Sequence, residues 1–123
     1  VATVRLRRPA QRNALHDADL HALLRLFATL DADESVRVVV LSADTTGHRR
    51  PVFSAGYHVG HFEDEQPGPL LFEQVPDALA RLRPITVCAL NGSVYGGATD
   101  IVLACDLRIA LAGCEWRMRR WRG

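Results

Sequence analysis

The sequence predicts a single α/β domain in which a parallel sheet is flanked by helices. Its 123 residues are 48% apolar and 24% charged, a composition typical of one globular domain. Residues 36–41 and 85–90 are short and almost continuously apolar, as expected for strands covered on both faces. A glycine turn, a predicted helix and another strand come after the second run, which is the order of a right-handed βαβ crossover.

The first half of the chain predicts a strand, a helix and a buried strand. Residues 1–6 alternate with a period of two until Pro9, which indicates a half-buried strand. The chain begins with Val inside this element, so we expect residues in front of it. Residues 17–30 predict an amphipathic helix with acidic residues in its first turn and apolar residues at intervals of three and four: Leu20, Leu23, Leu24, Phe27 and Leu30.

The second half predicts two more helices around the strand at 85–90. Residues 71–82 carry apolar side chains on one helical face, and Pro76, which lacks an N–H donor, indicates either one bent helix or two short ones. After a glycine pair, residues 98–105 predict a helix, and residues 106–111 alternate again as a strand.

Charge and cysteine content exclude several classes of function. All 15 basic residues are arginine, so lysine chemistry such as a Schiff base is excluded. Residues 1–116 carry a net charge of −3, which argues against a nucleic-acid-binding face. The three cysteines have spacings that fit neither a disulfide framework nor a metal site, so we expect buried thiols. Because no apolar run is long enough to span a membrane and no signal-peptide pattern is present, we expect a cytoplasmic protein without a membrane partner.

Two glycine-containing segments form the candidate functional site. Residues 53–57 (FSAGY) and 91–100 (NGSVYGGATD) each place glycine directly after an apolar strand. Glycines there leave backbone N–H groups able to face a ligand, and the second segment also lies at a predicted helix start. Together they could form an oxyanion hole; ordinary strand-to-helix turns are the alternative. Neither a G-x-S-x-G nucleophile elbow nor a G-x-G-x-x-G dinucleotide motif is present.

Several motifs occur in one fixed order along the chain. They are residues 4–15 (VRLRRPAQRNAL), 36–41 (VRVVVL), 53–56 (FSAG), 84–92 (PITVCALNG), 96–97 (GG) and 104–110 (ACDLRIA). In this order the motifs resemble the amino-terminal half of the crotonases, the enoyl-CoA hydratase/isomerase superfamily. The resemblance covers residues 1–116 and implies an incomplete spiral core of ββα units.

The resemblance also implies a substrate and an assembly. The substrate would be an acyl-CoA thioester of fatty acid metabolism, and the reaction that of a lyase (hydratase) or an isomerase. No metal is implied, and no cofactor is implied either, because coenzyme A is part of the substrate. A homo-oligomer, trimer or hexamer, is implied for the full-length parent.

By resemblance, the thioester oxygen would sit between the backbone N–H groups of Tyr57 and Gly97. Several further residues would bind substrate: Arg12, Ala55, Gly56, His58 and Gly96. Ala55 would lie beside the CoA adenine and Arg12 near the phosphates, where a guanidinium suits the chemistry; a solvated surface arginine is the alternative for Arg12. His58 would line the acyl pocket with Tyr57, or else lie on a surface loop.

Asp100 maps onto the first of two glutamates that hydratases of this superfamily use as general acid and base. It is one methylene shorter, so its reach falls by about 1.5 Å, a C–C bond length. The alternative is a helix-start acid that accepts hydrogen bonds from backbone N–H groups.

The second glutamate has no counterpart in the sequence. The arginine-rich residues 117–123 depart from the pattern, which we interpret as a truncated or frame-shifted terminus rather than a nucleic-acid arm. We therefore expect an acyl-CoA-binding core fragment over residues 1–116 that is weak or inactive as an enzyme. The alternative function is a non-catalytic relative that binds CoA esters or a partner subunit.

Overall fold

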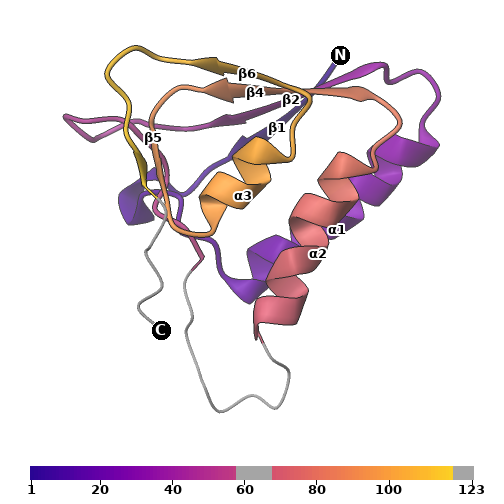
Figure 1. Ribbon diagram of the computed structural model, residues 1–123, viewed down its shortest axis with the longest axis horizontal. Helices are drawn as coiled ribbons and strands as arrows, with labels where there is room; N and C mark the ends of the chain where they lie inside the picture. The colour runs from indigo at the N-terminus through magenta and orange to yellow at the C-terminus, as the bar shows by residue number, and fades with distance from the viewer. Residues whose placement is uncertain (58–67, 118–123) are drawn as a thin grey trace.

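Four parallel strands form the main layer of the fold, and the helices lie on one side of it (Figure 1). The structure is a computed structural model that describes residues 1–57 and 68–117. The strands follow the order β1-β2-β4-β6, and every neighbouring pair is parallel. Their bounds are β1 Ala2–Leu6, β2 Val38–Ala43, β4 Ile85–Leu90 and β6 Leu107–Ala110. The predicted α/β class with a parallel sheet and flanking helices is confirmed.

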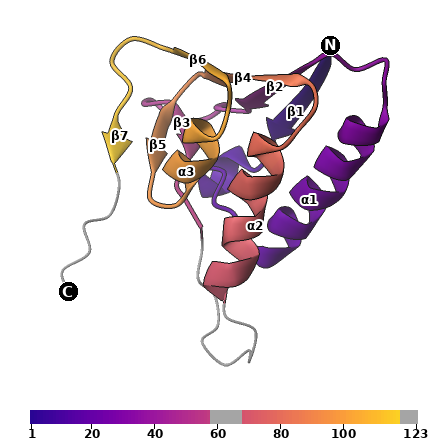
Figure 2. The same ribbon diagram turned by 45° about the vertical axis from the view of Figure 1, so that its right-hand side comes forward.

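Helices α1, Asp17–Ala32, and α2, Gly68–Ala80, pack side by side, and the shorter α3, Ala98–Leu103, lies next to α2 (Figure 2). A one-turn 3₁₀ helix, Pro9–Gln11, comes after β1. The predicted helix at residues 17–30 is present, with Leu20, Leu23 and Phe27 buried on its inner face. Helix α2 continues through Pro76, so the prolyl ring does not divide it.

A second, smaller sheet lies beside the main layer. It contains β3, Val52–Ser54, β5, Ser93–Tyr95, and β7, Trp116–Arg117, in the order β3-β5-β7. The sequence did not indicate this second sheet. Strands of two or three residues are too short to show a period of two, and their partners lie far apart in the sequence.

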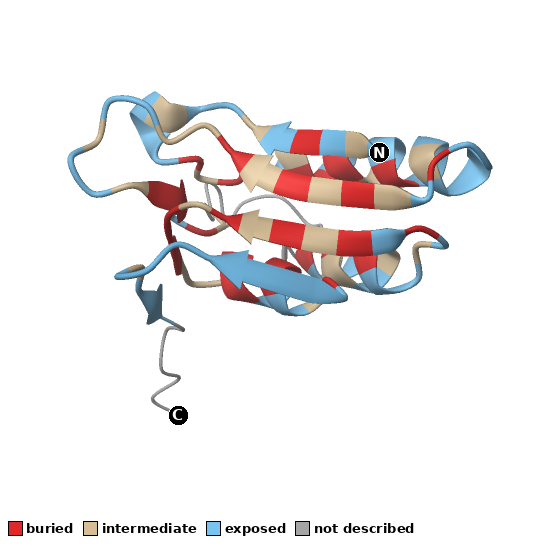
Figure 3. Cartoon of the chain, turned by 90° about the horizontal axis from the view of Figure 1, so that it is seen from above, coloured by how far each residue is buried: buried red, intermediate tan, exposed pale blue. Residues whose placement is uncertain are grey.

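Burial in the main sheet differs from the sequence expectation. Strand β2, and β4 after its exposed first residue Ile85, alternate between buried and half-buried residues instead of being covered on both faces, because the described helices cover only one face (Figure 3). Strand β6 was expected to alternate, but all four of its residues are exposed. As the last strand in the sheet order, β6 has a described neighbouring strand on one edge only.

Two of the three cysteines are buried thiols, as the sequence predicts. Cys88 and Cys105 are buried thiols, whereas Cys114 is only half-buried. A hydrogen bond with Cys105, together with burial, raises the pKa of the Cys88 thiol, so it is not an activated nucleophile. In the part of the chain that the structure describes, no helix combines the length and hydropathy needed to cross a membrane.

Candidate functional site

The two glycine segments lie in direct contact. Gly56 has a φ of +102°, and a Cβ atom there would lie 2.8 Å from the carbonyl oxygen of Tyr95. On the other side, a Cβ at Gly96, whose φ is +58°, would lie 4.0 Å from the Cα atom of Gly56. Only glycine combines this φ at position 56 with such a close backbone approach. The fold therefore brings residues 53–57 and 93–97 together, although about 40 residues separate them along the chain.

Backbone hydrogen bonds join residues 53–57 to the loop after β1. The N–H of Ala55 donates to the carbonyl oxygen of Arg12 at 2.8 Å, and the N–H of Leu15 donates to that of Gly56 at 2.9 Å. The buried Ser54 hydroxyl donates to the carbonyl of Asn13 at 2.8 Å and accepts from the N–H of Gly56 at 3.1 Å. These bonds fix the path of the chain on both sides of Gly56.

Asn13 stabilises the loop after β1 through its buried side chain. Its φ is +53°, in the left-handed region that asparagine adopts more readily than most residues, and its side chain is buried. The side-chain oxygen accepts from the N–H of Arg8 at 2.8 Å, and the amide nitrogen donates to the carbonyl of Asp44 at 2.9 Å. Asn13 belongs to the motif at residues 4–15, but spacing along one chain does not reveal a buried hydrogen-bonding partner.

Two backbone N–H groups at the site have no acceptor among the described residues. Within residues 1–57 and 68–117, neither Tyr57 nor Gly97 donates its N–H to another residue. Gly97 is the N-cap of α3, with φ −63° and ψ −21°. Tyr57 pairs with Leu15 in an isolated parallel bridge, whose hydrogen bond uses the carbonyl of Gly56 and leaves the Tyr57 N–H unused. These are the two residues to which the resemblance assigns the oxyanion hole.

The Tyr57 side chain is held at both ends. Its hydroxyl donates to the carboxylate of Asp17 in the first turn of α1, and its ring lies 5.4 Å from that of Phe72, at an interplanar angle of 35°. Burial, followed by the hydrogen bond to Asp17, raises the pKa of Tyr57 to about 12. The phenol therefore stays protonated at neutral pH.

Phe72 of α2 also lies against Gly97. A Cβ atom at Gly97 would come within 2.8 Å of the Phe72 Cζ atom and within 3.3 Å of both Cε atoms. Gly97 is thus required for close packing and not for its φ, which any residue can adopt. Phe72 could not be predicted as a site residue, because it lies beside Leu71 on the helix and nothing in the sequence shows which neighbour its ring meets.

The other described residues of the predicted site belong to the two glycine segments or to the loop that is hydrogen-bonded to them. Ala55, Arg12 and Asp100 are exposed. The Asp100 carboxylate, three residues after Gly97, accepts no hydrogen bond from a described residue, so the alternative of a helix-start acid that caps backbone N–H groups is not supported. His58 lies outside the described residues. No three metal-ligating side chains gather anywhere in residues 1–57 and 68–117.

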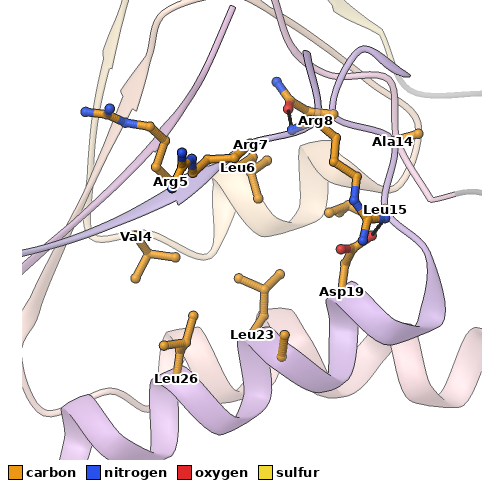
Figure 4. Close-up of a pocket in the computed structure, with 12 residues that line it drawn as sticks. Val4, Arg5, Leu6, Arg7, Arg8, Ala14, Leu15, Asp19, Leu23 and Leu26 are labelled. Carbon is orange, nitrogen blue, oxygen red and sulfur yellow. Dashed lines mark hydrogen bonds and ion pairs between the residues drawn. The ribbon is translucent and has the colours of Figure 1, made fainter. Parts of the chain in front are cut away.

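A pocket of about 240 Å³ lies between β1 and the first half of α1 (Figure 4). Leu6, Leu23 and Leu26 line it, and near one end Arg8 forms an ion pair with Asp19 at 3.0 Å. None of the residues predicted to bind substrate lines this pocket. Asn13 and Leu15 also line the pocket, and their hydrogen bonds with Ser54 and Gly56 place it next to the loop that holds the candidate site.

The fold and the site define an α/β protein in which two backbone turns meet beside a short helix. Residues 1–116 match the enoyl-CoA hydratase/isomerase family, and the chain belongs to that family. It is 33% identical over 121 residues to 4-chlorobenzoyl coenzyme A dehalogenase-1 of an Arthrobacter species, covering 89% of this chain and 41% of that protein. It is 32% identical over 115 residues to bovine enoyl-CoA hydratase domain-containing protein 2, mitochondrial, covering 89% and 38%.

Solved structures of the family share the fold. A monofunctional enoyl-CoA isomerase from M. smegmatis superposes with a TM-score of 0.74 at 33% identity, over 96% of this chain and 48% of that one. An enoyl-CoA hydratase from Bacillus anthracis superposes with a TM-score of 0.76 at 27% identity, over 88% and 42%. The chain thus spans less than half the length of each of these proteins.

Proposed function

We propose that this chain binds an acyl-CoA thioester and stabilises the enolate of its acyl group, as part of a hydratase or isomerase. The observation that carries the proposal is the pair of N–H groups at Tyr57 and Gly97, which meet no acceptor in residues 1–57 and 68–117 and lie on segments that touch at Gly56. Family membership supports the substrate class, since the dehalogenase and hydratase relatives are both named for coenzyme A thioesters.

Physical chemistry favours an oxyanion as the ligand of such a pair. Preorganised N–H donors need no reorganisation when negative charge develops on a thioester oxygen, and one such donor is typically worth about 3 kcal/mol in a transition state. Hydrogen bonds at Arg12, Leu15 and Ser54 fix the backbone of residues 54–56, directly before Tyr57. Such a site needs this rigidity. Coenzyme A would enter as part of the substrate, with Ala55 beside its adenine and Arg12 near its phosphates.

Asp100 is the proposed base for proton transfer at the α-carbon. It lies one helical turn after Gly97 and is exposed, so its carboxylate is available to a ligand held at the Gly97 N–H. One base is sufficient for enolisation, whereas hydration also needs a group that activates or protonates the second centre. We therefore expect enolisation to exceed hydration in this chain.

The experiment removes the acceptor from the ligand, because a backbone donor cannot be removed cleanly by mutation. Butyryl-CoA and S-butyl-CoA, a thioether that lacks the carbonyl oxygen, are titrated calorimetrically into the protein, with coenzyme A as reference. Two net hydrogen bonds of about 0.7 kcal/mol each predict that the thioether binds roughly tenfold more weakly. Equal affinities would contradict the proposed oxyanion hole. If neither ligand bound, the proposed acyl-CoA function would be contradicted.

A non-catalytic function that binds CoA esters or a partner subunit is the second candidate. It is favoured by the exposure of Asp100, whose carboxylate no described residue orients. Such a protein would discriminate butyryl-CoA from S-butyl-CoA but would exchange no α-proton. Proton exchange therefore separates the two functions.

A further inference from the structure

We propose that Phe72 is the specificity-determining residue of the site and restricts it to short acyl groups, of about the size of butyryl. This inference rests on the proposed function, because it concerns the same site. Its basis is that one ring contacts both residues whose N–H groups would hold the thioester oxygen. The Phe72 ring lies 5.4 Å from that of Tyr57, and its Cζ atom lies 2.8 Å from where a Gly97 Cβ would be.

The ring takes the space that a side chain at position 97 would otherwise occupy. Any other residue at position 97 would require the ring to move, since a separation under 3 Å is shorter than real carbon contacts. Phe72 is only 8% exposed and belongs to the hydrophobic core, so moving it would disturb the packing of α2. Phe72 therefore forms a fixed wall beside Gly97.

The side of the Phe72 ring that faces Tyr57 is also fixed in place. The Tyr57 ring packs on Phe72, and the hydrogen bond from its hydroxyl to Asp17 ties it to the first turn of α1. Phe72 thus cannot turn toward Tyr57 without displacing a ring that is itself anchored. Helices α1 and α2 pack together, which keeps the two anchoring elements in place.

When the N–H groups hold the thioester oxygen, the first carbons of the acyl chain would lie next to the Phe72 ring. An oxygen that accepts from the Gly97 N–H lies about 3 Å from that nitrogen, and the acyl carbons lie within a few bond lengths of the oxygen. The Phe72 ring packs against the same residue, so the acyl chain would run beside the ring. A short acyl group fits beside the ring, whereas a longer one requires space that the ring fills.

The test measures how affinity depends on chain length when the ring is removed. Affinities for butyryl-CoA and octanoyl-CoA are measured by calorimetry for the wild-type chain, Phe72→Ala and the milder Phe72→Leu. Phe27→Leu is the matched control, because Phe27 is a buried phenylalanine of α1 whose ring the structure does not place against Tyr57 or Gly97. Circular dichroism establishes that each variant is folded.

We expect the affinity ratio of octanoyl-CoA to butyryl-CoA to rise at least roughly tenfold in Phe72→Ala, since each newly buried methylene is worth about fourfold in affinity. Phe72→Leu should shift the ratio in the same direction by less, and Phe27→Leu should leave it unchanged. An unchanged ratio in a folded Phe72 variant, or an equal shift in Phe27→Leu, would overturn this inference alone. Failure of the wild-type chain to bind either ligand would overturn the proposed function and this inference with it.

Discussion

At the scale of single residues, Asp100 carries the proposed proton transfer. Replacing Asp100 by Asn preserves size and removes the base, so exchange of the α-protons of butyryl-CoA with deuterated water should fall about 100-fold or more. The affinity for butyryl-CoA should change little, because the proposed function assigns binding to backbone donors and to Arg12 and Ala55. Mass spectrometry of the recovered thioester measures the exchange. Equal exchange in both proteins would contradict the role of Asp100.

Tyr57 makes the stability of the protein depend on pH at the alkaline end. Its pKa rises from 10.0 to about 12 in the folded chain, through burial and the hydrogen bond to Asp17. Because the folded state holds the proton more tightly, this stabilisation is complete below pH 10 and is lost as the pH rises toward 12. The melting temperature of the wild-type chain should therefore fall relative to that of Tyr57→Phe across this window. Parallel melting curves of the two proteins from pH 9 to 12 would contradict the assignment.

At the scale of elements, Arg83 ties the carboxyl end of α1 to the segment before β4. The last turn of α1 has no basic residue of its own. The Arg83 guanidinium supplies this charge by donating to the carbonyl oxygens of Asp33 at 2.7 Å and Val36 at 3.0 Å. The backbone N–H of Arg83 also donates to the Asp31 carboxylate at 2.8 Å.

Loss of the Arg83 side chain should consequently destabilise the chain. Arg83→Ala removes the guanidinium hydrogen bonds, so we expect a loss of about 1–2 kcal/mol in the free energy of unfolding, measured by urea denaturation. Arg81→Ala is the control, because no side-chain hydrogen bond joins Arg81 to another described residue. Equal losses in the two variants would show that the carbonyl contacts contribute nothing.

At the scale of the whole molecule, residues 103–116 present an apolar strip. Five large side chains along it are exposed: Leu103, Leu107, Ile109, Leu111 and Trp116. Ile109 is 70% exposed on β6, whose outer edge faces no other described strand. An apolar strand with an unpaired edge favours association with other chains.

The isolated 123-residue chain should therefore self-associate and bind a hydrophobic dye. Ile109→Lys places a charge on the strip and should shift sedimentation toward the monomer. Leu26→Lys, at an exposed leucine beside the pocket on α1, is the matched control and should leave association unchanged. A wild-type chain that sediments as a monomer without binding dye would contradict this prediction. The trimer or hexamer expected of a longer parent stays a prediction.

The sequence by itself determined the class of fold and the segments that form the candidate site. Apolar periodicity located α1, and short apolar runs located β2 and β4, because burial imposes a local pattern that a single chain displays. Glycine directly after an apolar strand likewise indicates residues 53–57 and 91–100 as segments of the candidate site. These features depend on local backbone preferences and on residues that are neighbours in the sequence.

Only the tertiary structure decided what the site residues touch. The closeness of Gly56 to Tyr95, the placement of Phe72 against Gly97 and the buried hydrogen bonds of Asn13 join residues far apart in the sequence, and no local pattern encodes them. The same is true of the second sheet and of the exposed β6, because both depend on which surfaces the remaining elements cover. Composition and periodicity report that a residue is apolar or turn-forming, but packing determines its partner.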